Sequence, residues 1–266
     1  MVQQDILNFI ERHKIPGYAL DFSEFSEKQM KYEEQIFCRR TGGSSMRPEP
    51  QYENGESSAK KWKEHLGDRK AKILDVGCGE GYVLYFLEKR GFDCYGINLS
   101  IIETELARHG IPNPDSKIME WTGEASREVD IGSALDLPYP DGSFDGVACY
   151  GMLMMVPRAE RIFHPEKKFS PLEDAKTAIS EIGRVLKPGC RLHLVTMKNS
   201  TQDPERTEDY IGFDERAHTI YDAKGRGTKP RKPGIIDLLE EAGMKMTEMK
   251  PVHNKKDFWS ICADKE

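Results

Sequence analysis

Short apolar runs alternate with amphipathic segments along most of the chain after Ser57. Short apolar runs predict strands, and apolar positions that recur every three to four residues predict helices. The predicted strands are 72–76, 93–97, 127–131, 144–150, 191–197, 244–250 and 257–263. The predicted helices are 57–66, 81–90, 100–109, 171–186 and 234–242, with Ser100 as an N-cap residue. This alternation predicts an α/β fold, a doubly wound and mostly parallel sheet with helices on both faces.

Both ends of the chain depart from the alternation. The last two predicted strands are joined by a short polar turn, so we expect an antiparallel last strand. Residues 1–55 contain a short amphipathic helix at 2–14, an aromatic-rich stretch at 18–37 and a loop rich in Gly, Ser and Pro at 41–50. We therefore predict an N-terminal helical extension over 1–55 and an α/β domain over 56–266. The aromatic stretch forms either an apolar lid or a packing surface, and the pattern leaves both open.

Charge bounds the partners of the chain. The formal net charge of −6 disfavours a broad electrostatic grip on nucleic acid. Residues 224–232 form a local basic stretch, for which a solvated loop is the favoured interpretation and an RNA contact the alternative. We expect a small-molecule partner; the oligomeric state is not readable from the sequence.

Several other site and location classes lack their sequence signals. No apolar run approaches the length of a membrane span, and the N-terminus has no signal-peptide pattern. The six cysteines form no CxxC pair, which favours reduced thiols and a cytoplasmic location. The seven histidines show no zinc-binding spacing, so we expect no metal.

A glycine-rich turn follows the first predicted strand, with the sequence Asp75-Val-Gly77-Cys-Gly79-Glu-Gly81. Three glycines spaced two apart let a ligand lie against bare backbone. Ligands of open α/β sheets bind at the carboxyl ends of the strands, where this turn lies. Asp75 and Glu80 would repel a pyrophosphate but attract an ammonium or sulfonium group. S-adenosylmethionine carries both cations and no phosphate, so the residues favour it over NAD or ATP.

Four motifs in order resemble the class I, or Rossmann-like, S-adenosylmethionine-dependent methyltransferases. They are Ile73–Gly81, Leu137–Asp145, Arg184–Gly189 and Leu238–Met244. The similarity extends over roughly residues 57–263. It implies a seven-stranded sheet with an antiparallel last strand, S-adenosyl-L-methionine as cofactor, and methyl transfer as the reaction.

The resemblance also implies roles for single residues. Asp75 would hold the amino group of the cofactor, and the end of the second strand would face its ribose and adenine. Tyr150, Gly151 and Met152, which follow the fourth strand of the family pattern, would lie near the reactive methyl group. The implied cofactor-binding residues are Asp75, Gly77, Cys78, Gly79, Gly81, Asn98, Leu99, Ser133, Ala134, Leu135, Tyr150, Gly151 and Met152.

Two positions depart from the family pattern. Asn98 stands where an acidic residue is usual, and Ser133 stands where an Asp is frequent. An amide offers one acceptor oxygen to the ribose hydroxyls, whereas a carboxylate offers two. We therefore expect weaker cofactor binding, which Asn98→Asp should tighten.

Methyl transfer requires alignment of acceptor, methyl and sulfur, and a base only when the acceptor arrives protonated. His218 and Tyr150 are the catalytic candidates, with His164 and Tyr210 as alternatives. The expected acceptor is a small molecule. An RNA or protein methyltransferase and a non-catalytic adenosylmethionine-binding protein are the alternatives.

Overall fold

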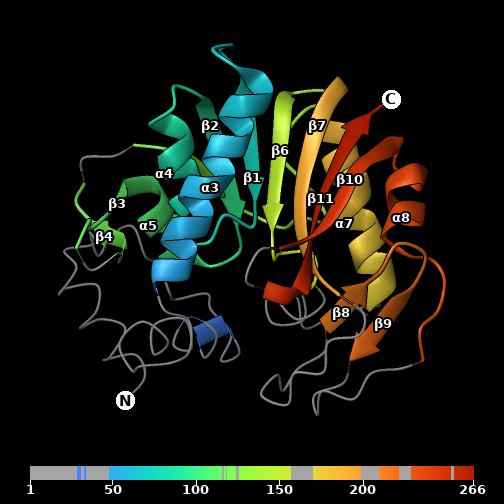
Figure 1. Cartoon of the computed structure of the whole chain (residues 1–266). Coiled ribbons are helices and arrows are strands. Elements are labelled where there is room, and N and C mark those ends of the chain that lie inside the picture. The colour runs from blue at the N-terminus through green and yellow to red at the C-terminus, as the bar shows by residue number, and fades with distance from the viewer. Residues whose placement is uncertain are drawn as a thin grey trace. The chain divides into compact units, whose positions relative to one another are not determined.

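The structure is a computed structural model, drawn in Figure 1, and it describes most of the chain after residue 47. The described residues are 29–30, 33, 48–115, 117, 119–123, 126–156, 170–198, 210–221, 229–252 and 255–266. The predicted helix at 2–14 and most of the aromatic stretch at 18–37 lie outside them. Within the described residues, no helix is long and apolar enough to cross a membrane.

Seven strands form one mixed sheet, as predicted. They are β1 (Lys72–Val76), β2 (Asp93–Asn98), β5 (Glu128–Ile131), β6 (Phe144–Tyr150), β7 (Leu186–Met197), β10 (Met244–Val252) and β11 (Lys255–Lys265). Their order is β10-β11-β7-β6-β1-β2-β5. The pairs β1–β6, β6–β7 and β2–β5 are parallel, whereas β11 is antiparallel to both β7 and β10. The predicted antiparallel last strand is therefore confirmed.

The chain divides into two compact units, of which the first comprises residues 1–71 and 78–131. Its described helices are α3 (Pro48–Leu66), α4 (Tyr82–Glu88) and α5 (Ile101–His109). In this unit α3 packs beside α4, and α5 packs on β2 and β5. Trp62 of α3, Leu84 of α4 and Leu106 of α5 are fully or almost fully buried, and such apolar burial is the main term that stabilises the unit.

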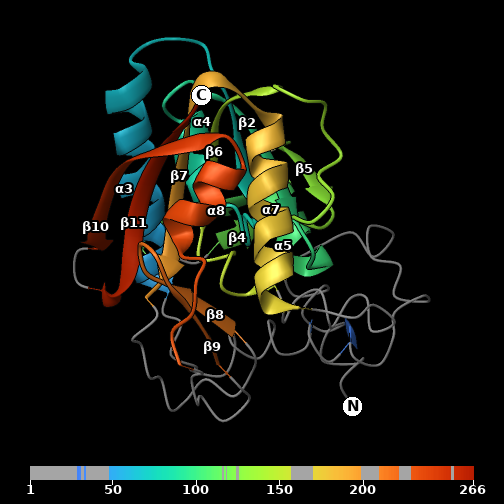
Figure 2. The ribbon, with the colours of Figure 1, turned by 90° about the vertical axis from the view of Figure 1, so that its right-hand side faces the viewer.

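The second unit comprises residues 72–77 and 132–266 and contains β1, β6, β7, β11 and β10. Figure 2 shows its helices α7 (Pro171–Val185) and α8 (Ile235–Glu241) lying side by side. The buried side of α7 presents Ala178, Ile179 and Ile182 at a helical spacing. The β6 strand is almost continuously buried, as expected for a central parallel strand.

The short elements were not predicted. Two antiparallel pairs, β3 (Gly110–Pro112) with β4 (Met119–Trp121) and β8 (Tyr210–Phe213) with β9 (His218–Tyr221), lie outside the strands that the sequence predicted. Strands of three or four residues contain too few positions to establish a period.

The start of the first described helix also differs from the prediction. The α3 helix begins at Pro48, inside the segment 41–50 that we expected to be a loop. Proline is favoured in the first turn of a helix, where its missing N–H has no intrahelical partner to lose. The helix continues through the expected boundary between 1–55 and 56–266, and that division stays a prediction. The predicted cap of α5 is confirmed, because Ser100 Oγ accepts a hydrogen bond from Glu103 N at 3.1 Å.

Candidate functional site

The end of β1 carries a buried carboxyl group. Asp75 is 2 % exposed, and burial raises the pKa of its carboxyl to about 7. Burial disfavours the charged form of an acid unless a cation or hydrogen-bond donors compensate. A bound cation beside Asp75 would supply that compensation. The first predicted site residue is therefore in a position that favours a cationic ligand.

Backbone geometry explains the three glycines of the turn. Gly77, Gly79 and Gly81 have φ angles of 73°, 52° and 84°, which side-chain-bearing residues rarely adopt. In the second unit, a Cβ on Gly77 would lie 2.5 Å from Met152 Cγ. In the first unit, a Cβ on Gly81 would lie 2.8 Å from Ala107 Cα. A Cβ on Gly79 would meet no described atom within 4 Å, so the middle glycine borders open space that a ligand can enter.

The end of β2, in the first unit, is a network of acidic and amide groups. Asn98 Nδ2 donates to Glu103 Oε2 at 2.9 Å, which leaves the Asn98 oxygen as the acceptor of that amide. Leu99 follows and is partly buried. Cys78 belongs to the same unit, and its N–H donates to the carbonyl of Ile97 at 3.2 Å.

A second carboxyl group caps the helix that follows β2. The buried side chain of Glu33 accepts from Ser100 Oγ at 2.7 Å and from Ile101 N at 2.8 Å. Burial raises the pKa of Glu33 to about 7, although these hydrogen bonds oppose the shift. Glu33 thereby satisfies a backbone N–H of the first turn of α5 that has no intrahelical acceptor.

Residues 133–135, in the second unit, form a tight turn. Ser133 Oγ accepts from Leu135 N at 2.9 Å, and Ala134 is 8 % exposed. The Ser133 hydroxyl, which stands where the family frequently has an Asp, therefore shapes its own loop, as Ser side chains in turns commonly do.

The end of β6 carries a polar network that extends into the buried part of the second unit. The Tyr150 hydroxyl lies 2.8 Å from His193 Nδ1, and His193 Nε2 lies 3.0 Å from Ser260 Oγ. The Tyr150 and His193 rings meet edge to face, with centroids 5.1 Å apart. Gly151 follows with a φ of 78° and donates its N–H to Val195 O at 2.8 Å. This hydrogen bond fixes the backbone position immediately before Met152.

His218 occupies a different environment in the same unit. It lies in β9, is 3 % exposed, and has its Nδ1 2.8 Å from the carbonyl oxygen of Pro233. Its backbone pairs with Arg231 in both directions, and its ring lies 6.5 Å from that of Phe213. These contacts hold the ring in place. His164 lies outside the described residues, as does the side chain of Tyr210.

The comparison with protein families assigns the central part of the chain. The family described as "Methyltransferase domain" matches residues 74–194, which include the glycine turn, β2 and β6. The chain contains a class I S-adenosylmethionine-dependent methyltransferase domain. The resemblance is thus confirmed for this domain, which contains the first three motifs from residue 74 onward, whereas the fourth, Leu238–Met244, lies outside the match.

Curated relatives match part of this chain at low identity. A probable chloroplastic tocopherol O-methyltransferase of Oryza sativa subsp. japonica is 31 % identical over 149 residues, 54 % of this chain and 33 % of the relative. The O-methyltransferase resE of Aspergillus sclerotiorum is 33 % identical over 187 residues, 68 % of this chain and 58 % of the relative. The chain thus spans only part of the length of the relatives it matches.

Solved structures share the fold of this chain. The magnesium protoporphyrin IX methyltransferase ChlM from Synechocystis PCC 6803, with bound SAM, has a TM-score of 0.55 at 14 % identity and covers 91 % of this chain and 99 % of its own. The PH0226 protein from Pyrococcus horikoshii OT3 has a TM-score of 0.54 at 20 % identity, with 89 % and 99 % covered. The likeness extends well beyond the residues that the family match covers.

Sequence reasoning missed four polar residues that the structure connects to the predicted ones. His193 and Ser260 join Tyr150, Glu103 joins Asn98, and Glu33 caps α5. A histidine inside the apolar run 191–197 was the available signal for the first network, because a buried polar side chain requires a partner. Glu33 had no such signal, since its partner is 67 residues away.

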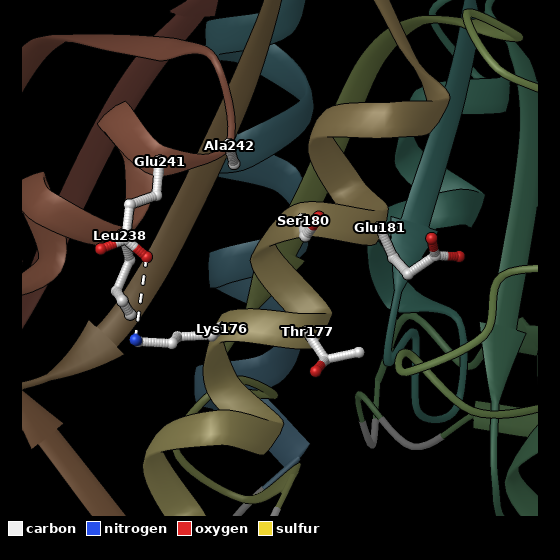
Figure 3. A pocket seen from close by; sticks show the side chains of 7 residues that line it. All are labelled: Lys176, Thr177, Ser180, Glu181, Leu238, Glu241 and Ala242. Carbon is white, nitrogen blue, oxygen red and sulfur yellow. Dashed lines mark ion pairs between the residues drawn. The ribbon is translucent and has the colours of Figure 1, made fainter.

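A surface pocket lies apart from these residues, between α7 and α8 of the second unit (Figure 3). Its lining residues are Lys176, Thr177, Ser180, Glu181, Leu238, Glu241 and Ala242. An ion pair of 3.8 Å joins Lys176 to Glu241 across it. None of the predicted site residues lines this pocket.

Proposed function

We propose that this chain is an S-adenosylmethionine-dependent methyltransferase that transfers the methyl group to a small-molecule acceptor. The observation that carries the proposal is the buried carboxyl of Asp75 at the start of a glycine turn. A carboxylate in that position gains most from a cationic ligand, since burial alone raises its pKa. S-adenosylmethionine is a ligand with cationic groups and no phosphate.

The residues present fit this cofactor. Asp75 would bind its ammonium group, and the open space at Gly79 admits a ligand against the backbone. Asn98 and Leu99 would contact the ribose, and Ser133 and the residues after it the adenine. Asn98 presents an acceptor oxygen because its NH₂ already donates to Glu103.

The cofactor, when bound, supplies a methyl group attached to a sulfonium. Once the methyl group is transferred, the rest of the cofactor is a neutral thioether. The protein must orient the acceptor on the line through methyl and sulfur and exclude water. Tyr150, Gly151 and Met152 follow the buried β6 strand and form the acceptor side of the proposed site. The contact of Met152 with Gly77 gives this segment a fixed distance from the glycine turn.

The names of several relatives support a small-molecule acceptor. They include a probable tocopherol O-methyltransferase, an ajmaline N-methyltransferase and a ubiquinone biosynthesis O-methyltransferase. The net charge of −6 adds support, because nucleic-acid partners generally require a basic surface.

Calorimetry with S-adenosylmethionine, S-adenosylhomocysteine, NADH and ATP tests the cofactor. Binding of the two adenosyl compounds alone is the expected result, and NADH binding without them would overturn the proposal. Transfer of an isotope-labelled methyl group is then measured on phenols, amines and sterols, with total RNA and a peptide library as further arms. Labelling of RNA or peptides alone would contradict the small-molecule acceptor, and binding without any transfer would indicate a non-catalytic protein.

A further inference from the structure

The polar network at the end of β6 crosses three neighbouring strands of the second unit. Tyr150 ends β6, His193 lies in β7, and Ser260 lies in β11. Tyr150 pairs with Val195, and Ser260 pairs with the same Val195 from the other side. Side chains two residues apart on a strand share a face of the sheet. The register therefore places all three polar side chains on one face, in agreement with their hydrogen bonds.

The position of the network relates it to the proposed site. Tyr150 is partly exposed, whereas His193 is 4 % exposed and Ser260 5 % exposed. The network thus runs from the partly open carboxyl end of β6 into the buried sheet. Asp75 pairs with Ala148, and Ala148 pairs with His193, so this carboxyl lies in the same row on the same face. Cys262 of β11 pairs with His193 from the other side.

We propose that Tyr150, His193 and Ser260 form a proton relay that lets this site methylate acceptors that arrive as neutral hydroxyl compounds. The proposal rests on the methyltransferase function proposed above. Tyr150 is the catalytic residue that touches the acceptor hydroxyl. His193 and Ser260 act through it as positioning residues.

The hydrogen bonds define the direction of the relay. A neutral His193 that accepts from the Tyr150 hydroxyl at Nδ1 carries its proton on Nε2 and donates it to Ser260 Oγ. The Tyr150 oxygen keeps lone pairs with which it accepts the hydrogen of the acceptor. As that proton passes to Tyr150, the original Tyr150 proton passes to His193 Nδ1.

The step balances in atoms and charge. The acceptor oxygen forms a bond to the methyl carbon, and the carbon–sulfur bond breaks with its electron pair left on a neutral sulfur. The positive charge that leaves the sulfonium appears on the His193 imidazolium, so the site gains no net charge. That exchange matters because burial penalises an uncompensated imidazolium. After product release, the proton returns through Tyr150 to solvent.

The first test uses the full chain without cofactor. Nitrogen NMR of labelled histidine is expected to place the proton of neutral His193 on Nε2, and Tyr150→Phe is expected to shift the Nδ1 resonance. A proton on Nδ1 would overturn the relay, because His193 would then donate to Tyr150 and could take no proton from it. This readout is independent of turnover, so a failure of the proposed function remains distinguishable.

The second test compares two phenols as acceptors, weakly acidic 4-methylphenol and acidic 4-nitrophenol. Tyr150→Phe and His193→Asn are expected to lower kcat about 10²-fold with 4-methylphenol at neutral pH, with KM changed less than about threefold. The asparagine keeps an acceptor for Tyr150 but takes up no proton. With 4-nitrophenol, which is largely ionised at about pH 8, the loss should fall below about fivefold.

The matched control is Thr196→Val on the same strand, since Thr196 is fully buried and its hydroxyl has no partner among the described residues. Thr196→Val is expected to leave kcat unchanged with both phenols. An equal loss of kcat with both phenols would show that Tyr150 and His193 are merely structural. Methyl transfer to amines with no turnover of either phenol would contradict the relay and leave the proposed function intact, whereas no transfer to any acceptor class would contradict the proposed function.

Discussion

Two buried carboxyl groups, Asp75 and Glu33, share a raised pKa of about 7 but differ in what surrounds them. Glu33 accepts hydrogen bonds from a serine hydroxyl and a backbone N–H, and its role is completed within the protein. For Asp75, burial is the cause of the shift, and no hydrogen bond from the described residues opposes it. A buried acid that the fold itself satisfies is a structural cap, whereas one that the fold leaves to burial alone indicates a ligand with positive charge.

Removing the charge of Asp75 should have the largest effect on the cofactor. Asp75→Asn is expected to weaken S-adenosylmethionine binding by about 10- to 100-fold, the usual contribution of a hydrogen bond to a charged group. Calorimetry measures this, with Asp136→Asn as a control of equal charge change at an exposed position of the same unit. Unchanged affinity in Asp75→Asn would show that Asp75, like Glu33, does not bind the cofactor.

The same variant should gain stability at alkaline pH. A carboxyl whose pKa is raised in the folded state contributes stability at low pH that is lost as pH rises from its usual 3.8 to about 7. Asp75→Asn lacks this loss, so its free energy of unfolding at about pH 8 should exceed that of the wild type by on the order of 4 kcal/mol. Urea melts at about pH 5 and pH 8 compare the two proteins. A variant that is less stable at both pH values would contradict the assignment.

Cofactor affinity should depend on pH through Asp75. The cation prefers the ionised carboxylate, so affinity should rise nearly tenfold per pH unit below about 7 and level off above it. Calorimetry in buffers of different ionisation enthalpy should detect proton release on binding at about pH 6. Asp75→Asn should lose both effects, and their persistence there would assign the titration to another group.

Glu33 should behave in the opposite way. Glu33→Ala removes the cap of α5 and is expected to cost about 1–3 kcal/mol of unfolding free energy, because it leaves buried donors without an acceptor. Glu33→Gln resembles the protonated acid and should cost less than about 0.5 kcal/mol near pH 6. Both should keep cofactor affinity within about threefold. Thermal melts and calorimetry on the pair of variants distinguish a cap from a ligand contact.

The smallest effect is expected at Asn98. The sequence alone predicted that Asn98→Asp tightens cofactor binding, but the structure revises this. The NH₂ of Asn98 donates to Glu103, so Asn98→Asp alone would oppose two carboxylates and should change cofactor affinity less than about threefold. The double variant Asn98→Asp with Glu103→Gln restores a donor opposite the new acid and should bind more tightly than the single one. Calorimetry compares the cofactor affinity of the two variants. Tight binding by the single variant would show that Glu103 does not limit cofactor affinity.

Much of the fold could be predicted because its signals are local. The apolar runs of β1, β6 and β7 and the cap at Ser100 follow from residues adjacent in the sequence. The short β3–β4 and β8–β9 pairs could not be predicted, since their strands contain too few residues to show a period.

The site could be predicted only in part, for a similar reason. The glycine turn could be predicted from the spacing of its glycines and from its flanking charges, and Asp75 belongs to this turn. The partners of Tyr150 lie 43 and 110 residues further along the chain, so only strand register brings them together. Asn98 and Glu103 are five residues apart in the sequence, so their contact could have been predicted. The helix that begins after Ser100 turns Glu103 back toward the strand end.

The place of β11 in the sheet has a consequence for biosynthesis. This strand is the last of the seven to leave the ribosome, yet it inserts between β7 and β10, which are both complete before it. Until it arrives, two strand edges stay open to pairing with other chains, a known route to aggregation. The polar network at the end of β6 also lacks Ser260 until then. Closure of the sheet and completion of this network therefore both depend on the pairing of β11.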